Sequence, residues 1–347
     1  MNKIRALFDK DFALAYLTEN VLQFYPPFKK IVKLKIESYK KNIWATTYHV
    51  VISYRLTFLN KVNKEEEMEI VCSAHSEEPR KNVFKVLNYL WETGLFKGKL
   101  VIPRPLFFSE EFNGVFYRAV SGHNLLYFIK NKKKKKITSM VEKSALLFAR
   151  LHTLALPDDQ SIFVDSNSLL RNVVPGRDMI ISEIRERFNG LYVEEIASHY
   201  EKFIHEEEKY LNSTKERHLI HGDAHPENII AVGRTKIGVI DFTDFCPGDF
   251  TRDLGTFMQQ LEYKIKRHDL GLEFTVKMKK LFLSIYLKKR KLKMTPVLQK
   301  RIDLYYNWTA VRTAAFWLLK FDAEPVKAEK ALIALAENIK NDHRAQD

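Results

Sequence analysis

Cysteine and long apolar runs are both scarce in this chain. Its 347 residues include only Cys72 and Cys246, too few for a disulfide framework or a zinc site. No apolar run approaches the roughly 20 residues that a membrane-spanning helix needs. The first five residues are not followed by the apolar core of a signal peptide. We therefore expect a cytoplasmic protein without a membrane span.

Internal repeats and low-complexity linkers are also missing, and the composition is that of a globular protein. Hydrophobic residues make up 46% of the chain and charged residues 29%, and the length allows one large core or two modest ones. The net charge is +14, and its densest cluster is Lys130 with residues 132–136. No aromatic residues interrupt this cluster, which reads as an exposed loop before a helix. Nucleic acid is not an expected partner, and no pattern indicates an oligomeric state.

One stretch of eight residues, 221–228, carries most of the functional information. It reads His-Gly-Asp-Ala-His-Pro-Glu-Asn, and a second aspartate, Asp241, follows thirteen residues after Asn228. Pro226 disfavours a continuous helix, so Asp223 and Asn228 are predicted to share a tight loop. An Asp that orients a hydroxyl, with an Asn and an Asp that hold Mg²⁺, is the residue set of metal-dependent phosphoryl transfer.

The segment between Asn228 and Asp241 predicts a β-hairpin. Two short apolar runs, residues 229–232 and 237–240, flank a turn that contains Gly233. Because the ends of a hairpin are neighbours, we expect Asn228 and Asp241 to lie close together. Their two oxygens would suit Mg²⁺, which takes few protein ligands and completes its shell with water and phosphate oxygens.

Simpler interpretations exist for each residue alone. A single Asp in a loop is usually a cap or turn residue, and a single His in an apolar context is usually a satisfied core residue. His221 is accordingly expected to pack inward and support the loop. The whole constellation, with a hairpin of suitable length, is far more specific and favours a phosphoryl-transfer site.

Residues 219–255 resemble the aminoglycoside phosphotransferase and choline kinase group of the protein-kinase-like superfamily. The group's catalytic loop, His-Gly-Asp-x-His-x-x-Asn, matches residues 221–228, and its metal-binding strand end matches Ile240 and Asp241. Its downstream Gly-Asp and Asp-Leu pairs match residues 248–249 and 253–254. The resemblance implies an α+β, two-lobed, kinase-like fold that uses ATP or GTP and Mg²⁺. It also implies roles for seven residues: Asp223 as catalytic base, Asn228 and Asp241 as magnesium ligands, and His221, His225, Asp249 and Asp253 as supports of the catalytic loop.

The first 120 residues are predicted to form the N-terminal lobe. Helical periodicity covers residues 2–22. Two strands joined near residues 39–42, a third over 68–74, a helix over 80–91, and strands near 100–102 and 115–120 would follow. The resulting five-stranded sheet with one helix is what a kinase N-lobe looks like. Residues 118–120 would lead into the hinge, whose backbone usually meets the adenine, so Arg118, Ala119 and Val120 are candidate nucleotide contacts.

Residues 121–347 are predicted to form a mainly helical C-terminal lobe that carries the catalytic loop and the metal-binding hairpin. Ser139 and Glu142 suggest a capping box at the start of one helix. Two helices are expected within 178–211, joined near Asn189 and Gly190. Residues 311–319 are apolar nearly all round, which predicts a deeply buried helix.

The N-terminal part departs from the group in its phosphate-binding residues. The group's third strand carries a Lys for the phosphates, and here that position falls on Cys72 or Ser73. The helix at 79–91 lacks the Glu that pairs with this Lys, since the nearest are Glu77 and Glu78. The loop at 39–42 contains no Gly. The candidate nucleotide contacts in this region are Lys33, Lys35, Lys40, Lys41 and Cys72.

Three functions are compatible with these patterns to different degrees. The leading one is a small-molecule kinase that acts on a hydroxyl of an aminoglycoside, amino sugar, sugar or choline-like alcohol. A protein kinase fits less well, because no Ala-Pro-Glu segment closes an activation loop after Asp241. The alternative from another class is a pseudokinase-like binding or regulatory module, suggested by the missing Lys and Glu. Residues 158–217 carry excess acid, so Glu194, Glu195 and Glu201 are candidate contacts for a cationic acceptor, or a solvated helix face.

Overall fold

The computed structural model describes residues 2–78, 80–95, 98–163 and 168–344 and divides the chain into two compact units. The N-terminal unit comprises residues 1–123 together with residues 230–243, and the C-terminal unit comprises residues 124–229 and 244–347. The prediction placed the hairpin that ends at Asp241 with the C-terminal lobe. Residues 230–243 instead make their contacts with the N-terminal unit, because β10 pairs with a strand of that unit.

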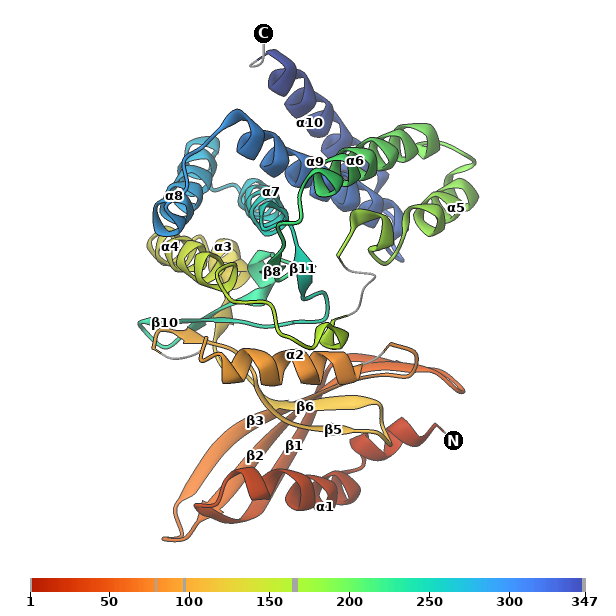
Figure 1. Cartoon of the computed structure of the whole chain (residues 1–347). Coiled ribbons are helices and arrows are strands. Elements are labelled where there is room, and N and C mark those ends of the chain that lie inside the picture. Colours follow the sequence, from red (N-terminus) through yellow and green to blue (C-terminus); the bar gives the residue numbers. More distant parts are fainter. Residues whose placement is uncertain (1, 79, 96–97, 164–167, 345–347) are drawn as a thin grey trace. The chain divides into compact units, whose positions relative to one another are not determined.

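A five-stranded antiparallel sheet forms the body of the N-terminal unit (Figure 1). Its strand order is β1–β2–β3–β6–β5. The strands are β1 (Phe28–Ile43), β2 (Tyr48–Asn60), β3 (Glu65–His75), β5 (Arg104–Ser109) and β6 (Gly114–Arg118). Alternation of side chains along β2 and β3 gives the sheet two faces, of which one carries the buried residues Ile52, Tyr54, Ile70 and Cys72.

The helices of this unit cover opposite faces of the sheet (Figure 1). The N-terminal segments η1 (Lys3–Phe8), α1 (Lys10–Val21) and η2 (Leu22–Phe24) pack against the apolar face, where Ile4, Leu7 and Leu17 join the core. Asp9 ends η1 and caps α1 by accepting a hydrogen bond from the Phe12 amide, so the single predicted helix over 2–22 is interrupted. Helix α2 (Arg80–Glu92) contacts β3, β5 and β6.

A second, small sheet has the strand order β4–β10–β9–β7. Its strands are β4 (Leu100–Val101), β7 (His123–Asn124), β9 (Ile229–Val232) and β10 (Lys236–Val239). Neighbouring strands β9 and β10 form the predicted hairpin around Gly233. The segment near 100–102 therefore does not belong to the five-stranded sheet; β5, which was not predicted, takes that place.

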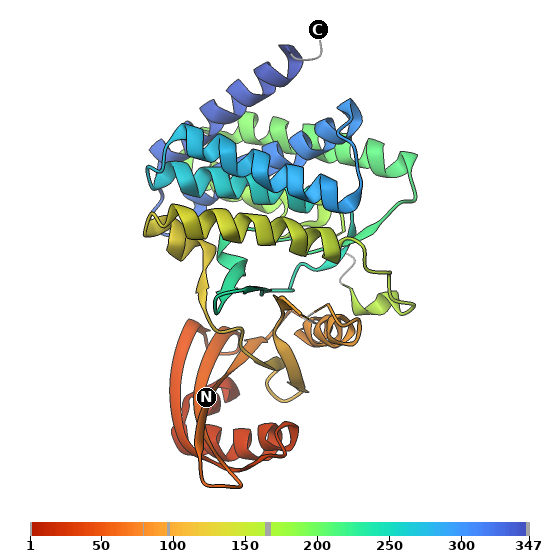
Figure 2. The ribbon, with the colours of Figure 1, turned by 90° about the vertical axis from the view of Figure 1, so that its left-hand side faces the viewer.

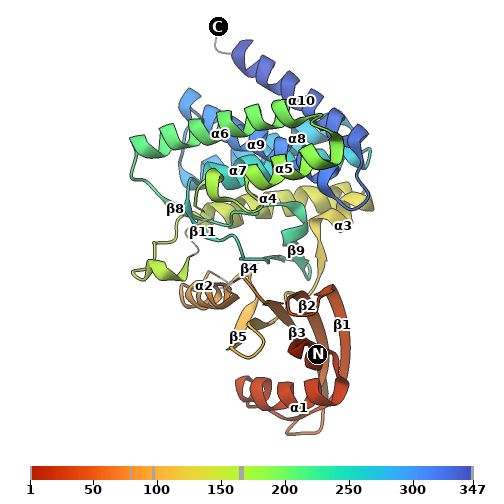
Figure 3. The same cartoon turned by 90° about the vertical axis from the view of Figure 1, so that its right-hand side faces the viewer.

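The C-terminal unit is built from helices around a short strand pair, β8 (His218–Ile220) with β11 (Cys246–Gly248). Figure 2 shows α4, α7 and α8 as neighbouring helices, and Figure 3 shows α5, α6 and α9 together. The α-helices are α3 (Leu125–Lys130), α4 (Lys134–Leu151), α5 (Arg177–Phe188), α6 (Val193–Ser213), α7 (Thr251–Arg267), α8 (Leu272–Arg290), α9 (Pro296–Leu319) and α10 (Pro325–Arg344). Short 3₁₀ turns are η3 (Gln160–Ile162), η5 (Leu170–Asn172) and η6 (Pro226–Asn228).

Helix α9 lies at the centre of this unit and contacts α5, α6, α7 and α10. Val311, Ala314 and Leu318 are fully buried, which confirms the predicted deeply buried helix. The two helices predicted within 178–211 are α5 and α6. None of the described helices combines the length and apolar character that a bilayer crossing requires.

Two local predictions were wrong. Helix α4 begins at Lys134, so Ser139 lies inside the helix and forms no capping box with Glu142. Three lysines of the basic cluster, 134–136, therefore belong to the first turn of α4 rather than to a loop. The first two strands are also longer than predicted, because β1 continues through residues 39–42 and pairs with β2 as far as Ile43 and Tyr48.

Candidate active site

The loop that carries Asp223 follows β8 and depends on a glycine. Gly222 has a φ of +80°, and a Cβ at this position would lie 2.2 Å from the carbonyl oxygen of Asp244. A side chain therefore has no room here, and the left-handed conformation also favours glycine. The close approach of residues 222 and 244 brings the loop next to the segment that precedes β11.

Asp253, at the start of α7, anchors this loop through hydrogen bonds. Its carboxylate accepts hydrogen bonds from the amides of His221, at 2.7 Å, and Gly222, at 3.0 Å. Nε2 of His152 lies 3.0 Å from the same carboxylate, and Nδ1 of His152 lies 2.8 Å from the Tyr286 hydroxyl. Burial alone would raise the pKa of Asp253, but His152 and His221 lower it overall. The buried, ionised carboxylate thus fixes two consecutive amides of the catalytic loop.

Asp249 stabilises the neighbouring turn into α7. It accepts a hydrogen bond from the Thr251 amide at 2.9 Å and forms a two-pronged ion pair with Arg301 of α9. The Arg301 guanidinium also lies 4.1 Å from the centre of the Tyr210 ring. These contacts join the start of α7 to α9 and α6, which are the helices behind the loop.

A chain of charged groups runs along the loop from Asp223. His225 lies 3.1 Å from Asp223 and 2.9 Å from Glu227, and Lys264 of α7 pairs with Glu227 at 2.5 Å. Burial would lower the pKa of His225, but the two carboxylates raise it to about 10. Burial would likewise raise the pKa of Asp223, but His225, His221 and Asn228 lower it overall. At neutral pH we therefore expect a carboxylate at Asp223 beside an imidazolium.

Asn228 ends the loop and leads directly into β9. Its Nδ2 donates to the backbone carbonyl of Asp223 at 3.0 Å and to the Asp223 carboxylate at 3.2 Å. No residue that the structure describes donates a hydrogen bond to its Oδ1. The Asn228 oxygen is thus left available as a ligand.

Asp241 follows β10 and belongs to the N-terminal unit. Its φ of +64° is rare for a residue with a side chain. Oδ1 accepts a hydrogen bond from the Thr243 hydroxyl at 2.8 Å, while Oδ2 has no partner within the described ranges. Asp241 and Asn228 therefore lie just outside the two ends of the β9–β10 hairpin, and each offers one oxygen.

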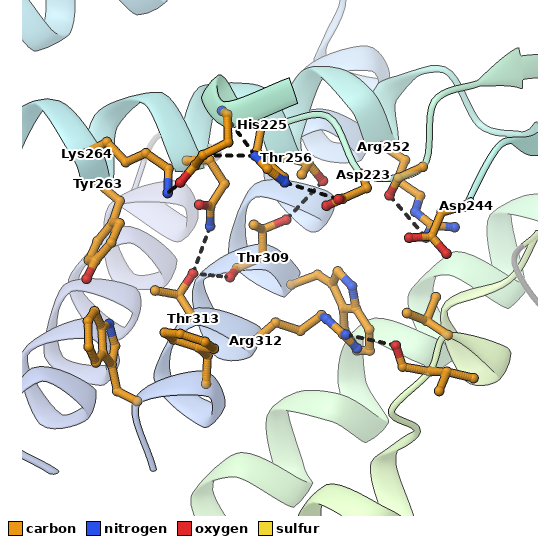
Figure 4. Close-up of a pocket in the computed structure, with 18 of the residues that line it drawn as sticks. Asp223, His225, Asp244, Arg252, Thr256, Tyr263, Lys264, Thr309, Arg312 and Thr313 are labelled. Carbon is orange, nitrogen blue, oxygen red and sulfur yellow. Dashed lines mark hydrogen bonds and ion pairs between the residues drawn. The ribbon is translucent and has the colours of Figure 1, made fainter. Parts of the chain in front are cut away.

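A cavity of about 470 Å³ opens beside Asp223 in the C-terminal unit (Figure 4). The Asp223 side chain in its wall is 40% exposed. Thr256, Gln260, Thr309 and Thr313 line it with hydroxyl and amide groups, which hydrogen-bond to one another between α7 and α9. The rest of the lining includes aromatic and charged side chains: Tyr263, Trp308, Phe316, Trp317, Glu227, Asp244, Arg252, Lys264, Arg267 and Arg312.

The predicted nucleotide contacts on the first strands are exposed. Lys33 pairs with Glu65 at 3.1 Å, Lys35 pairs with Glu37 at 2.6 Å, and the Lys41 ammonium lies 4.5 Å from the Phe8 ring centre. Lys40 is exposed as well. Such pairs on a solvated surface contribute little to stability.

Cys72 and the predicted hinge lie in different surroundings. Cys72 is fully buried in the core that α1 covers, and burial raises the pKa of its thiol, so this placement argues against a nucleotide contact. Arg118 pairs with Ile70 at the end of β6, and the Ala119 amide donates to the carbonyl of Glu69 at 2.9 Å. Val120 follows and packs close to Gly238 of β10.

The predicted acceptor contacts lie on α6. Glu194, Glu195 and Glu201 are all exposed, and none of them lines the cavity. Glu201 forms an ion pair with Arg177 of α5. This arrangement matches the solvated helix face that was the alternative interpretation.

Several residues of the site were not predicted from the sequence. Lys264, Arg267 and Arg312 reach the cavity from α7 and α9, about 40 to 90 residues after the catalytic loop. Arg80, at the start of α2, donates to the Thr243 hydroxyl at 3.1 Å. No short motif contains these residues, since only the packing of the helices brings them to the site. One feature of the sequence did point to Arg80, which lies close to Glu77 and Glu78.

Comparisons with known proteins identify the family and the fold. The profile described as the phosphotransferase enzyme family matches residues 45–269, which is more than half of the chain. No curated protein matches the sequence. The fold is similar to choline kinase from Cryptosporidium parvum Iowa II, with a TM-score of 0.62 and 12% identity over 96% of both chains.

Two further solved structures share the fold. Ethanolamine kinase from Plasmodium vivax has a TM-score of 0.57 and 17% identity, over 87% of this chain and 81% of that one. A ternary complex of APH(2")-IIa with streptomycin and ATP has a TM-score of 0.51 and 18% identity, over 94% and 96% of the two chains. At these identities the similarity establishes the fold, a mixed α+β fold with a sheet-containing N-terminal part and a helical C-terminal part. The family profile goes further, and it shows that this chain is an enzyme of the phosphotransferase family.

Proposed function

We propose that the chain is a small-molecule kinase that transfers the γ-phosphate of ATP or GTP to a hydroxyl of a small acceptor. The observation that carries the proposal is the Asp223 carboxylate, which is held rigidly by the loop and faces a cavity large enough for a small molecule. Phosphoryl transfer needs positioning and charge neutralisation more than covalent help from the protein. The cavity beside Asp223 supplies the first of these.

In this proposal Asp223 accepts a hydrogen bond from the attacking hydroxyl. The lowered pKa of Asp223 keeps it ionised at neutral pH, so it can orient the hydroxyl and take up its proton as the new bond forms. His225 and Asn228 hold the carboxylate in place. Asp253 acts indirectly, since it fixes the two amides that precede Asp223.

The residues at the ends of the β9–β10 hairpin fit a magnesium ion. Asn228 Oδ1 and Asp241 Oδ2 are oxygen donors without a hydrogen-bond partner in the described part of the chain, and Mg²⁺ prefers few such protein ligands. A magnesium ion held by these two residues would neutralise charge on the phosphates of the nucleotide. The β9–β10 pairing supports Asn228 and Asp241 as joint ligands, because a hairpin brings its ends together.

The acceptor proposed first is a neutral or cationic polyol or amino alcohol. The structural neighbours include proteins described as choline kinase, ethanolamine kinase and a streptomycin complex, which supports hydroxyl-bearing acceptors of this class. The hydroxyl groups of Thr256, Thr309 and Thr313 in the cavity suit hydrogen bonding to a polyol.

A second acceptor class is favoured by the charges in the cavity. Arg267 and Arg312 form no ion pair within the described ranges, and Arg312 donates to the carbonyls of Val174 and Pro175. The carboxylates, by contrast, have cationic neighbours, since Asp223 and Glu227 contact His225. An alcohol that also carries a carboxylate or phosphate group would find two guanidinium groups there.

The test is transfer of labelled γ-phosphate to a panel of neutral, cationic and anionic alcohols, with ATP and with GTP. We expect turnover with one of these classes, and we expect Asp223→Asn to reduce kcat by at least about 100-fold, the usual range for a lost general base. If no alcohol is phosphorylated while the protein still binds a partner or ligand, the binding-module interpretation replaces this one. Asp322→Asn, an exposed change on the same unit, serves as the matched control.

A further inference from the structure

The N-terminal unit contains one buried charged residue within its described ranges, Arg80. Its side chain is only 5% exposed, although it carries a full positive charge. A buried cation without an ionised or polar partner for each of its donors is costly, so such residues are normally paired throughout. The hydrogen bonds of Arg80 therefore indicate which further group its guanidinium can bind.

Three of the contacts of Arg80 are made by its terminal nitrogens. Nη1 donates to the Thr243 hydroxyl at 3.1 Å, and Nη2 lies 2.9 Å from the Glu78 carboxylate and 3.3 Å from Nε2 of His49. Nη1 has two N–H bonds, of which Thr243 takes one. The Nε atom is buried and has no hydrogen-bond partner in the described part of the chain. The guanidinium thus keeps unused donors, and a buried unused donor costs free energy until an acceptor arrives.

The Nη1 end of the guanidinium is linked to the proposed magnesium ligand. The Thr243 hydroxyl, which accepts from Arg80, itself donates to Asp241 at 2.8 Å. One hydroxyl therefore connects the guanidinium to the carboxylate. A metal ion on Asp241 would bind phosphate oxygens. A guanidinium that is linked to Asp241 through one hydroxyl is well placed to contact the same phosphates.

The two histidine rings near Arg80 add no positive charge of their own at neutral pH. Burial lowers the pKa of His49 to about 4, and burial also lowers the pKa of His75, so both rings are neutral at pH 7. Glu78 is the counter-charge, but its side chain is 48% exposed, so solvent weakens its attraction for Arg80. An incoming anion would meet a cation that is only partly neutralised.

We propose that Arg80 binds the α- and β-phosphates of the nucleotide beside Asp241, with Glu78 as its ion-pair partner. Arg80 and Glu78 then supply, from the start of α2, the cation–carboxylate pair that is missing from β3 and from the interior of the helix. This inference rests on the proposed kinase function. It identifies the residue that takes the place of the absent lysine. None of the lysines on β1 is buried enough for that role.

The test compares two ligands that differ only in their phosphates. Binding of Mg·ADP and of adenosine is measured, by competition against a fluorescent adenine nucleotide, for the wild type, Arg80→Gln, Arg80→Lys and the control Lys81→Gln. Lys81 is the next residue of α2 and pairs with Glu110 on the surface, so its change removes the same charge from the same helix. Midpoints of thermal unfolding without ligand show whether each variant folds.

We expect Arg80→Gln to weaken Mg·ADP about 10- to 100-fold, the range for a lost charge-assisted contact, and to leave adenosine within about threefold. Arg80→Lys keeps the charge but not the fork of donors, so its loss should be smaller. Lys81→Gln should leave the affinity for both ligands unchanged.

Two results would overturn the inference alone: an unchanged Mg·ADP affinity in Arg80→Gln, or an equal loss for ADP and adenosine, which indicates a purely structural role. If Arg80→Gln does not fold, the result for Arg80→Lys tests the inference instead. A phosphate-binding role requires Arg80→Lys to lose affinity for Mg·ADP and to keep its affinity for adenosine. A wild type that binds neither Mg·ADP nor, in the same assay with a guanine nucleotide probe, Mg·GDP would instead overturn the proposed function, and this inference with it.

Discussion

Glu207 shows how a single buried carboxyl affects the pH dependence of stability. It is 1% exposed within the helical core and accepts hydrogen bonds from the Leu170 amide at 2.7 Å and the Tyr305 hydroxyl at 2.9 Å. Burial raises the pKa of Glu207 to about 7, despite these hydrogen bonds and the nearby Arg252. Because the pKa in the unfolded chain is lower, the folded protein holds the extra proton between about pH 4.5 and 7.

This extra proton determines the direction in which the stability of the protein changes with pH. The stabilisation is fully present below the unfolded pKa and is lost as the pH rises through 7, by roughly 3 kcal/mol in the free energy of unfolding. Glu207→Gln mimics the neutral form, with its oxygen facing Leu170 and its amide facing Tyr305. We expect it to unfold at a higher temperature than the wild type at pH 8 and at the same temperature near pH 5. A constant difference between pH 5 and 8 would contradict the raised pKa.

Asp253 gives a second prediction at the scale of one residue. Asp253→Asn retains one acceptor oxygen for the two loop amides, so one buried N–H is left without its partner. A cost of about 1–3 kcal/mol in unfolding free energy is expected, together with a fall in kcat because the loop carrying Asp223 loosens. Chemical denaturation and steady-state kinetics measure both. A stable variant with normal kcat would show that the loop does not need this anchor.

The sequence revealed some of these residues and not others, for identifiable reasons. Asp223, Asn228 and Asp241 stand in a short motif whose spacing reflects local geometry, so the motif could be recognised directly. Arg80 and Arg312 lie far from the motif in sequence, and only tertiary packing gives them their surroundings. The placement of the lysines on β1 depended on which strand face is solvated, which the sequence pattern left open.

At the scale of helices and strands, α7 and α9 cross closely beside the cavity. A Cβ on Gly255 would lie 2.6 Å from the Ile302 carbonyl oxygen and from the Tyr306 amide nitrogen. These atoms belong to the backbone of α9 and cannot move aside as a flexible side chain would. Glycine therefore allows the two helices that line the cavity to approach each other this closely.

We expect Gly255→Ala to destabilise the protein by about 1–3 kcal/mol or more, because the helices must separate. Helix separation should also raise the KM for the acceptor, since Thr256 and Thr309 bridge the same crossing. Gly176→Ala is the matched control; its added Cβ would meet no atom nearer than 3.8 Å. Equal unfolding midpoints for the two variants would contradict this account of the crossing.

The elements themselves were predicted with uneven success. Long periodic segments such as α2, α5 and α6 were recognised, because one apolar face repeats over several turns. Boundaries failed where short-range signals competed: the pattern of Ser139 and Glu142 resembles a cap, but α4 had already begun at Lys134. Strand β5 was missed because it begins with Arg104 and Pro105, and proline is unusual within a strand.

At the scale of the whole molecule, the chain combines a net charge of +14 with a ligand that would be strongly anionic. A positive protein attracts nucleotides at a distance, but salt screens this attraction over about 10 Å at 0.1 M. Specific binding must therefore come from short-range contacts, for which Asn228, Asp241 and Arg80 are the proposed groups.

The most direct test of the central claim is the thermal unfolding midpoint with ATP or GTP, with and without Mg²⁺, for the wild type and Asp241→Ala. A ligand at about 100 times its Kd stabilises a protein by about 2.7 kcal/mol, which is a readily measured shift. We predict a shift with at least one nucleotide that requires Mg²⁺ and disappears in Asp241→Ala. No shift with either nucleotide at millimolar concentration, or an equal shift in Asp241→Ala, would contradict a magnesium-dependent phosphotransferase site in this chain.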